Sequence, residues 1–151
     1  MNSSKYVIFG MGDEQFAVNI EQVDSIERVS EMTKVPQAPH FMQGFTDLRG
    51  EVISVVDLKA LLDIGTVDLS KDPRLIIAQI ENLKIALLVD EAKEVLDLES
   101  DIVEEPPKMV GGVKKEYIQG VARLEDRLII IMNMNNVLNV NEIEQIKAAN
   151  E

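Results

Sequence analysis

The stretch from Gln43 to Ile64 has a pattern of apolar and polar positions that predicts a turn, a buried strand and a short helix without a gap. Residues 52–56 supply β-branched side chains to both faces of the strand. Leu58, Leu61 and Leu62 then recur at the spacing of one helical face. A strand that runs directly into a helix forms a rigid unit, and we expect the other segments to pack against it.

Two polar residues mark the ends of this strand. Asp57 follows its last apolar residue and is placed to cap the helix, which we expect to stop before Gly65. Arg49 lies near the other end, as the cation of a Leu48-Arg49-Gly50 corner. The sequence therefore predicts a capped helix at one end of the strand and a charged corner at the other.

Two further regions have the pattern of β-hairpins. Residues 5–9 and 15–20 read as antiparallel strands on either side of a turn that contains two glycines. Residues 74–78 and 83–89 repeat this arrangement, with Glu81-Asn82 at the turn.

The segment after the first hairpin can be read in two ways. Val23, Ile26 and Val29 recur at every third position, which fits a short helix or a bent strand with a helical turn. Further along, residues 39–42 are expected to form one helical turn that leads into Gln43.

The second half of the chain resembles the first at two places. Placing Lys5 on Arg74, an offset of 69, aligns the two hairpins. Placing Gln43 on Gln119, an offset of 76, aligns QGFTDLRGEVISVVDLKALLDI with QGVARLEDRLIIIMNMNNVLNV. Two matches in the same order predict one β-rich module used twice, although short Val/Ile/Leu-rich strands can also resemble one another by composition alone.

Each predicted half, 5–65 and 74–140, holds four or five short strands and one helix, too few to bury much apolar surface alone. We therefore expect a mainly β fold of two small barrels packed together in a single domain, 1–151. The second half carries an insertion at 98–117, with a Pro pair and a Gly pair, that reads as a long surface loop. Residues 141–151 are expected to form a C-terminal helix or a tail.

The composition favours a globular protein and argues against several functions. Hydrophobic residues make up 46% of the 151 residues and aromatic residues only 4%, so the core must consist mainly of Val, Ile, Leu and Met. A net charge of −12 would repel nucleic acid and anionic membranes. Cysteine is absent, which excludes disulfides and thiolate chemistry. Without a signal-peptide pattern or a stretch of roughly 20 apolar residues, the protein is expected in the cytoplasm.

Few residues in the chain could carry catalysis. His40, the single histidine, lies between two apolar residues and reads as a surface residue of a turn. Gly10-Met11-Gly12 lacks the third glycine of a dinucleotide-binding motif. Carboxylate pairs in so acidic a chain are expected to be solvated surface groups rather than metal ligands. The sequence therefore predicts no enzyme, no cofactor and no metal site.

A phosphoryl-accepting receiver domain is the enzyme-like alternative. Such a domain has an acidic pair after its first strand and an aspartate at the end of a later strand, for which Asp13, Glu14 and Asp57 are candidates. A receiver also needs a helix after the acidic pair, whereas residues 15–20 read as a strand.

Taken together, the motifs resemble those of the CheW family, the coupling proteins of bacterial chemotaxis. The resemblance rests on GDEQFAVNI, VPQAPHFMQGFTDLRGEVISVVDL, LLVDEAKEV, EEPP and YIQGVARLEDRLIIIMNMNNVL, and it runs almost end to end. It implies two intertwined five-stranded SH3-like barrels with a few short helices, and no catalysis. It also implies that the protein bridges the cytoplasmic tips of methyl-accepting chemoreceptors and the regulatory domain of the histidine kinase CheA.

The same resemblance suggests a receptor-binding surface. The NLRG motif of the family maps to residues 47–50, and its arginine is thought to support this surface. Arg49 could brace backbone carbonyls and carboxylates, or it could contact the receptor directly. The expected receptor-side residues are Val23, Ser25, Gly44, Asp47, Leu48, Arg49 and Gly50.

Three residues depart from the family pattern. Asp47 stands where Asn is common, Ser54 where Pro is usual, and Ser25 where Glu is common. The Ser25 difference bears most on the affinity for the partner and on its identity. The same adaptor fold serving another chemosensory pathway, such as surface motility, is a further candidate function.

Overall fold

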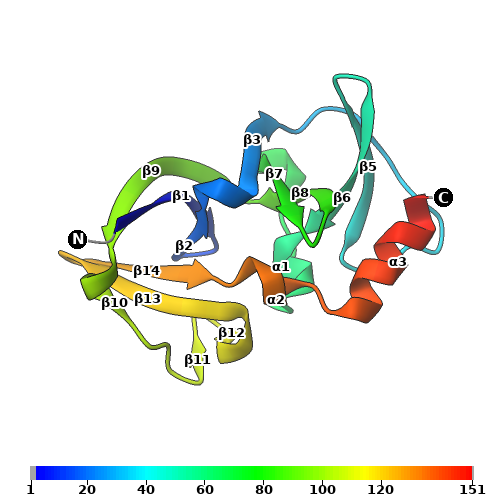
Figure 1. The fold of residues 1–151 in the computed structure, drawn as a ribbon. Coiled ribbons are helices and arrows are strands. Elements are labelled where there is room, and N and C mark those ends of the chain that lie inside the picture. Colours follow the sequence, from blue (N-terminus) through cyan, green and yellow to red (C-terminus); the bar gives the residue numbers. More distant parts are fainter. Residues whose placement is uncertain (1–2, 151) are drawn as a thin grey trace.

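The computed structural model describes residues 3–150, which form a mainly β fold with two six-stranded sheets. Sheet A consists of β1 (Ser3–Met11), β2 (Glu14–Asn19), β9 (Glu91–Glu99), β10 (Val103–Glu104), β13 (Ile118–Leu124) and β14 (Arg127–Met132). Sheet B consists of β3 (Val23–Arg28), β4 (Met32–Thr33), β5 (Met42–Leu48), β6 (Glu51–Asp57), β7 (Arg74–Ile80) and β8 (Leu83–Val89). The two sheets lie side by side in Figure 1, with sheet A at left. Because β10 and β4 have only two residues each, each sheet has the five longer strands of the predicted barrels.

The remaining elements are short. They are η1 (Ile20–Gln22), α1 (Leu58–Leu61), η2 (Leu69–Lys71), η3 (Ser100–Ile102), β11 (Met109–Val110), β12 (Val113–Lys114), η4 (Lys115–Tyr117), α2 (Met134–Val137) and α3 (Val140–Asn150). Asn139 and Glu142 start α3 with a reciprocal cap, in which each backbone N–H donates to the other side chain, at 3.0 and 2.7 Å. In Figure 1, α3 lies beside sheet B.

The strand order shows how the two barrels are intertwined. Sheet A has the order β10-β13-β14-β2-β1-β9, and sheet B has the order β3-β7-β8-β6-β5-β4. Sheet A thus takes its strands from the beginning and the end of the described chain, and sheet B takes its strands from the middle. A parallel pair closes the centre of each sheet, β2 with β14 and β6 with β8. Sheet B is thus formed by one continuous stretch, residues 23–89, and sheet A by the strands on either side of it, so neither sheet coincides with a predicted half, 5–65 or 74–140.

Three apolar clusters fill this arrangement. A small cluster lies within sheet A, around Ile8 and Ile129, and another lies within sheet B, around Ile53 and Ile77. The largest cluster takes alternate residues from both sheets, such as Phe9 and Ile76, and so joins the barrels. The central strands are therefore buried on both faces, which is why they read as continuous Val/Ile/Leu runs.

The two predicted halves, 5–65 and 74–140, have corresponding contacts in the structure. The Asp57 backbone N–H donates to the Phe41 carbonyl at 2.8 Å, and at the positions offset by 76 Asn133 donates to Tyr117 at 2.9 Å. In each predicted half the opening hairpin lies in one sheet and the closing hairpin in the other. The repeat itself stays a prediction.

Most of the predicted elements are confirmed, and one expectation is wrong. Both hairpins form, and the ambiguous segment is a 3₁₀ turn followed by strand β3. Residues 39–42 form a turn, in which the Met42 N–H donates to the Pro39 carbonyl at 2.9 Å. The insertion at 98–117 is not an irregular loop, because it contains η3, β10, the β11–β12 hairpin and η4. Strand β9 was not recognised as a strand.

Ser54 is expected to be a site where substitution stabilises the protein. Within residues 3–150, its hydroxyl is the buried side-chain polar group without a hydrogen-bond partner. Ser54→Ala should therefore raise the free energy of unfolding by about 1 kcal/mol, measured by urea denaturation. Thr46→Val is the control with the opposite sign, because the buried Thr46 hydroxyl donates to the Glu31 carbonyl at 3.3 Å. A destabilised Ser54→Ala variant would contradict the assignment.

Candidate partner-binding site

The corner between β5 and β6 is a two-residue hairpin turn. Arg49 and Gly50 have φ angles of 54° and 86°, and positive angles at both positions suit the twist of the flanking strands. The Asp47 carboxylate accepts a hydrogen bond from the Gly50 backbone N–H at 2.9 Å. An aspartate therefore supplies the acceptor that an asparagine would supply there, and the corner keeps a fixed shape.

Arg49 reaches from this corner to the edge strand of the same sheet. Its Nη2 atom lies 3.0 Å from Oε2 of Glu27 on β3. The Arg49 side chain is 72% exposed and that of Glu27 only 22%. Within residues 3–150, the arginine has this carboxylate contact and no hydrogen bond to a backbone carbonyl. An ion pair this exposed contributes about 0–1 kcal/mol, so it orients the guanidinium more than it stabilises the sheet.

Strand β3 supplies the surface beneath Arg49. Its residues alternate between half-buried and exposed, so that Ser25 and Glu27 lie on one face. The family commonly has Glu at the position of Ser25. In this chain Glu27, two residues further along β3, provides a carboxylate on the same face. Exposed Ile26 lies on the opposite face, and exposed Val52 lies on β6 next to the corner. Glu27 was not predicted from the sequence as a site residue. The alternation of half-buried and exposed positions along β3, which puts Glu27 on the same face as Ser25, could have indicated it.

The other predicted residues are less exposed. Val23 and Leu48 are half-buried and pack against apolar clusters. Gly44 is buried in β5, where a Cβ atom would overlap the Thr33 carbonyl of β4. The structure thus places Asp47, Arg49 and Gly50 at the surface, leaves Ser25 half-buried on β3, and places Gly44 inside the sheet.

A second charged group lies along the same barrel. Lys84 of β8 lies 3.1 Å from Glu51 and 3.4 Å from Asp24, which joins three strands of sheet B. The hydrogen bond to Glu51 raises the pKa of Lys84 above its ordinary value of 10.5. The lysine therefore keeps its charge throughout the neutral range.

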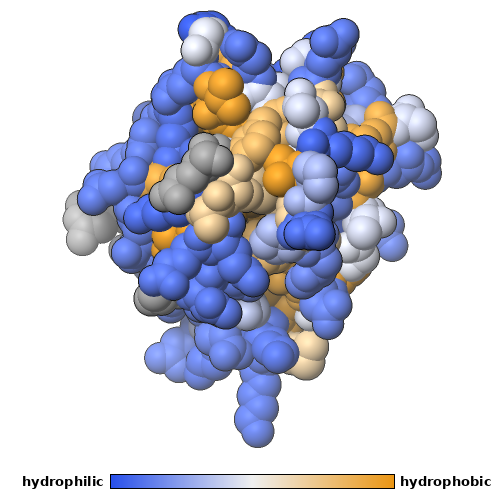
Figure 2. Space-filling model, turned by 90° about the vertical axis from the view of Figure 1, so that its right-hand side faces the viewer, coloured by the Kyte–Doolittle hydropathy of each residue, from blue (hydrophilic) through white to orange (hydrophobic). Residues whose placement is uncertain are grey.

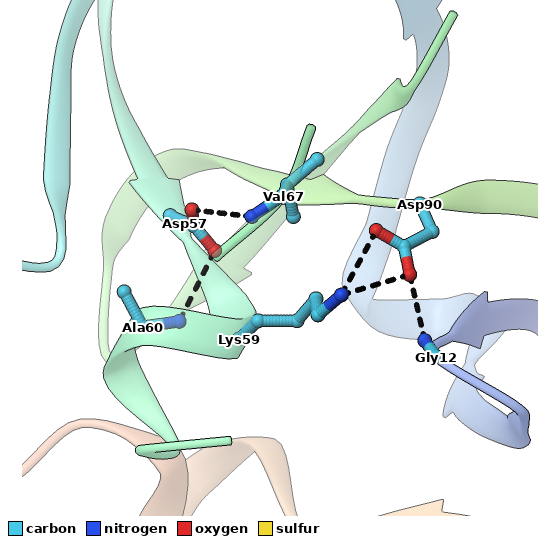
Figure 3. Close-up of polar contacts among 6 residues, drawn as sticks. All are labelled: Gly12, Asp57, Lys59, Ala60, Val67 and Asp90. Carbon is cyan, nitrogen blue, oxygen red and sulfur yellow. Dashed lines mark hydrogen bonds and ion pairs between the residues drawn. The ribbon is translucent and has the colours of Figure 1, made fainter. Parts of the chain in front are cut away.

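Asp57 occupies a buried position at the end of β6. Its two carboxylate oxygens accept hydrogen bonds from the backbone N–H groups of Ala60 at 3.1 Å and Val67 at 2.9 Å, as Figure 3 shows. The predicted helix cap is confirmed. The receiver interpretation is wrong, because this carboxylate is 1% exposed and the acidic pair is followed by strand β2 rather than by a helix.

A neighbouring ion pair connects the two sheets. The Asp90 carboxylate accepts from Lys59 of α1 at 3.2 Å and from the backbone N–H of Gly12, in the β1–β2 turn, at 2.6 Å (Figure 3). Lys59 belongs to the helix that follows sheet B, whereas Gly12 belongs to a turn of sheet A. This contact, together with the shared core, fixes the barrels relative to one another.

Two open grooves lie on the described part of the chain. One of about 420 Å³ lies beside Lys59 and Asp90, and another of about 400 Å³ lies between α3 and residues 35–39. Figure 2 shows the side of the molecule at right in Figure 1, where a strip of apolar residues lies among hydrophilic ones. Within residues 3–150, no group of three His, Asp or Glu is placed to hold a metal ion, and no helix is long and apolar enough to cross a membrane.

Two interlocked barrels with a shared core and a charged corner at the surface define a double-β-barrel protein. A family model described as a CheW-like domain matches residues 5–142. The chain belongs to the CheW family, the non-catalytic scaffolding proteins of chemotaxis.

Individual relatives agree with this assignment over most of their length. The chemotaxis protein CheW of Bacillus subtilis is 30% identical over 137 residues, which cover 89% of this chain and 86% of the relative. The probable chemotaxis protein CheW of Rhizobium etli is 28% identical over 138 residues, which cover 91% of this chain and 89% of the relative. The scaffolding protein TtCheW from Thermoanaerobacter tengcongensis superposes with a TM-score of 0.82 at 32% identity, over 94% of this chain and 92% of TtCheW. The predicted family, fold and adaptor role are confirmed.

Proposed function

We propose that this adaptor couples the cytoplasmic tips of methyl-accepting chemoreceptors to the regulatory domain of the histidine kinase CheA. Membership of the CheW family supports the pathway, and the Arg49 corner supports the receptor-side site. The guanidinium is 72% exposed and yet held 3.0 Å from Glu27. An exposed cation with a fixed orientation can donate several hydrogen bonds to carboxylates or carbonyls of a partner. The protein would act in the cytoplasm, at receptor arrays on the membrane.

The proposed receptor surface has an outer and an inner part. Asp47, Arg49 and Gly50 form the exposed outer part, and half-buried Ser25 adjoins it on the face of β3 that carries Glu27. The inner part consists of Val23, Gly44 and Leu48, which would shape this surface from within the barrel. Modest affinity at one site is sufficient if many sites are arranged in an array.

Arg49→Ala is expected to reduce receptor-dependent activation of CheA about tenfold. The change removes the donors of the exposed guanidinium, whereas the lost ion pair with Glu27 should cost no more than about 1 kcal/mol of stability. The measurement is kinase activity in a reconstituted mixture of receptor fragment, CheA and this protein. Thermal unfolding of the variant checks that the fold is kept.

Two matched variants make this experiment decisive. Arg28→Ala removes an exposed cation at the end of β3, which has no ion pair in residues 3–150, and should leave activation unchanged. Glu27→Gln keeps the arginine but removes the carboxylate that orients it, so it should give a smaller loss than Arg49→Ala. Normal activation by a well-folded Arg49→Ala protein would refute the proposed site.

An adaptor of a different chemosensory pathway is the second candidate. Ser25, which stands where Glu is common in the family, supports this candidate. Capture of the histidine kinases of the source organism on this protein distinguishes the candidates. Retention of a kinase other than the chemotaxis CheA would favour the second pathway.

A further inference from the structure

The parallel strand pairs that join the two predicted halves have the same register in both barrels. Each barrel combines the opening hairpin of one half, β1–β2 or β7–β8, with the closing hairpin of the other half, β13–β14 or β5–β6. In sheet A, Ile130 of β14 pairs with Phe16 of β2. Ser54 and Ile85, which correspond to them at the offsets of 76 and 69 residues, pair in sheet B. By register alone, each closing hairpin would therefore also fit the opening hairpin of its own half.

A polar network crosses this joint in sheet A. Arg127 of β14 donates through Nη2 and Nε to the side-chain oxygen of Gln15 on β2, at 2.8 and 3.1 Å. Its Nη1 atom lies 2.9 Å from the carboxylate of Glu94 on β9. One cation of the closing hairpin thus contacts a neutral amide and one carboxylate.

Sheet B has a network at the corresponding positions, with the charges placed differently. Lys84 of β8 stands at the position of Gln15, and its Nζ atom lies 3.1 Å from Glu51 of β6. Glu51 in turn stands at the position of Arg127. Asp24 of β3 lies 3.4 Å from the same lysine. The cation therefore belongs to the closing hairpin in sheet A and to the opening hairpin in sheet B.

Pairing each closing hairpin with its own half would separate these partners. Glu51 would then face Gln15 and have no cation across the joint, whereas Lys84 would face Arg127. Like charges opposite one another on neighbouring strands are destabilising. Each observed contact is partly exposed and therefore weak by itself. The difference between the two arrangements, however, includes attraction in one and repulsion in the other.

We propose that the two networks select the observed pairing, in which the closing hairpins are exchanged between the halves, and disfavour the pairing of each half with itself. The contacts of Arg127 and Lys84 stabilise the observed fold, and the repulsion between these two cations raises the free energy of the competing fold. A chain of two similar halves needs such a distinction, because the apolar positions of the joint match in both arrangements. This selection concerns the fold and does not depend on the proposed receptor contact.

Two charge variants of the full chain test this selection. Glu51→Arg/Arg127→Glu exchanges the charges of the closing hairpins and keeps the net charge, so it should reverse the preference. Adding Gln15→Lys and Lys84→Gln transfers each complete network to the other barrel, and the observed pairing should return.

A matched control exchanges charges without touching the joints. Arg123 of β13 and Glu104 of β10 lie 3.2 Å apart and both belong to the second half. Arg123→Glu/Glu104→Arg therefore reverses an ion pair of similar exposure class, keeps the net charge, and leaves the choice between the two pairings unchanged.

Introduced cysteines report which strands are neighbours, because the chain has no cysteine of its own. Ala17→Cys/Ile131→Cys occupies a directly paired position of β2 and β14 and should crosslink in the observed fold. Ala17→Cys/Val55→Cys should crosslink only when β2 pairs with β6, since Ala17 and Val55 lie in different apolar clusters. Each charge variant is combined with each cysteine pair, refolded from urea under oxidising conditions, and scored for the crosslink.

Glu51→Arg/Arg127→Glu should lower the 17–131 crosslink about threefold and produce the 17–55 crosslink, which the wild-type and control chains should not form. The transferred networks should restore the wild-type pattern. An unchanged pattern in Glu51→Arg/Arg127→Glu would overturn the proposal and assign the pairing to the connections between strands. A loss that the transferred networks do not reverse, or an equal loss in the control, would overturn it as well.

Discussion

Asp57→Ala is expected to destabilise the protein by about 3–5 kcal/mol, a large share of the stability of a domain of this size. The Asp57 carboxylate is buried, and its oxygens accept from the N–H groups of Ala60 and Val67. Alanine would leave both N–H groups buried without this acceptor. Hydrogen bonds to a charged group contribute about 1.5–3 kcal/mol each. Urea denaturation followed by circular dichroism measures the loss.

Asn133→Ala provides the matched control. Asn133 lies at the position of the second half that aligns with Asp57, and within residues 3–150 its side chain makes no capping hydrogen bond. Its replacement should therefore cost no more than about 1 kcal/mol. Asp57→Asn should be intermediate, because one amide oxygen can still accept one of the two bonds. Equal losses in Asp57→Ala and Asn133→Ala would contradict the capping explanation.

The example of Asp57 shows what the sequence could predict. Its cap on α1 depends on neighbours in sequence, where a β-branched run gives way to leucines at helical spacing. The hairpin turns are local in the same sense. Its second bond joins β6 to Val67, ten residues later in an irregular connection, and no periodic pattern indicates such a contact. The residues next to Asp57 in sequence were thus sufficient to predict the cap of α1, whereas the hydrogen bond to Val67 is known only from the structure.

Strand β9 was missed for a different physical reason. It pairs with β1 along one side only, and most of its nine residues are exposed and charged. An edge strand with charged side chains avoids pairing with other molecules, but it reads as a polar connection. The insertion that follows was misread because its strands have only two residues each, too few for alternation to be visible.

The candidate site could be predicted only in part. The residues of the β5–β6 turn came from the resemblance to the CheW family, and the structure gives them a reason in the positive φ angles of Arg49 and Gly50. Glu27 could not be predicted as the partner of Arg49, because that contact requires sheet B to bring β3 near the corner. Ser25 illustrates the same limit. Its difference from the family suggested a lost carboxylate, whereas a carboxylate lies two residues away on the same face.

Gly44→Ala is expected to cost about 2–4 kcal/mol, the largest effect among the predicted receptor-side residues. Gly44 has a φ angle of 146°, a conformation that L-residues rarely adopt. An added Cβ would also overlap the Thr33 backbone carbonyl, so the β4–β5 pair would have to separate. Amide hydrogen exchange of residues 32–33 and 45–46 should report that separation directly.

Gly120→Ala is the control at the aligned position of sheet A. There the added Cβ would meet the movable Val103 side chain at 2.5 Å and the Glu104 backbone carbonyl at 3.1 Å, a tight contact but not an overlap, and Gly120 does not have the positive φ angle of Gly44. A smaller loss, about 1 kcal/mol, is therefore expected. Receptor binding by Gly44→Ala should fall together with the protection of the β4–β5 pair, because the glycine is buried and shapes the surface from within. If Gly44→Ala keeps its stability but loses receptor binding, Gly44 itself must approach the partner.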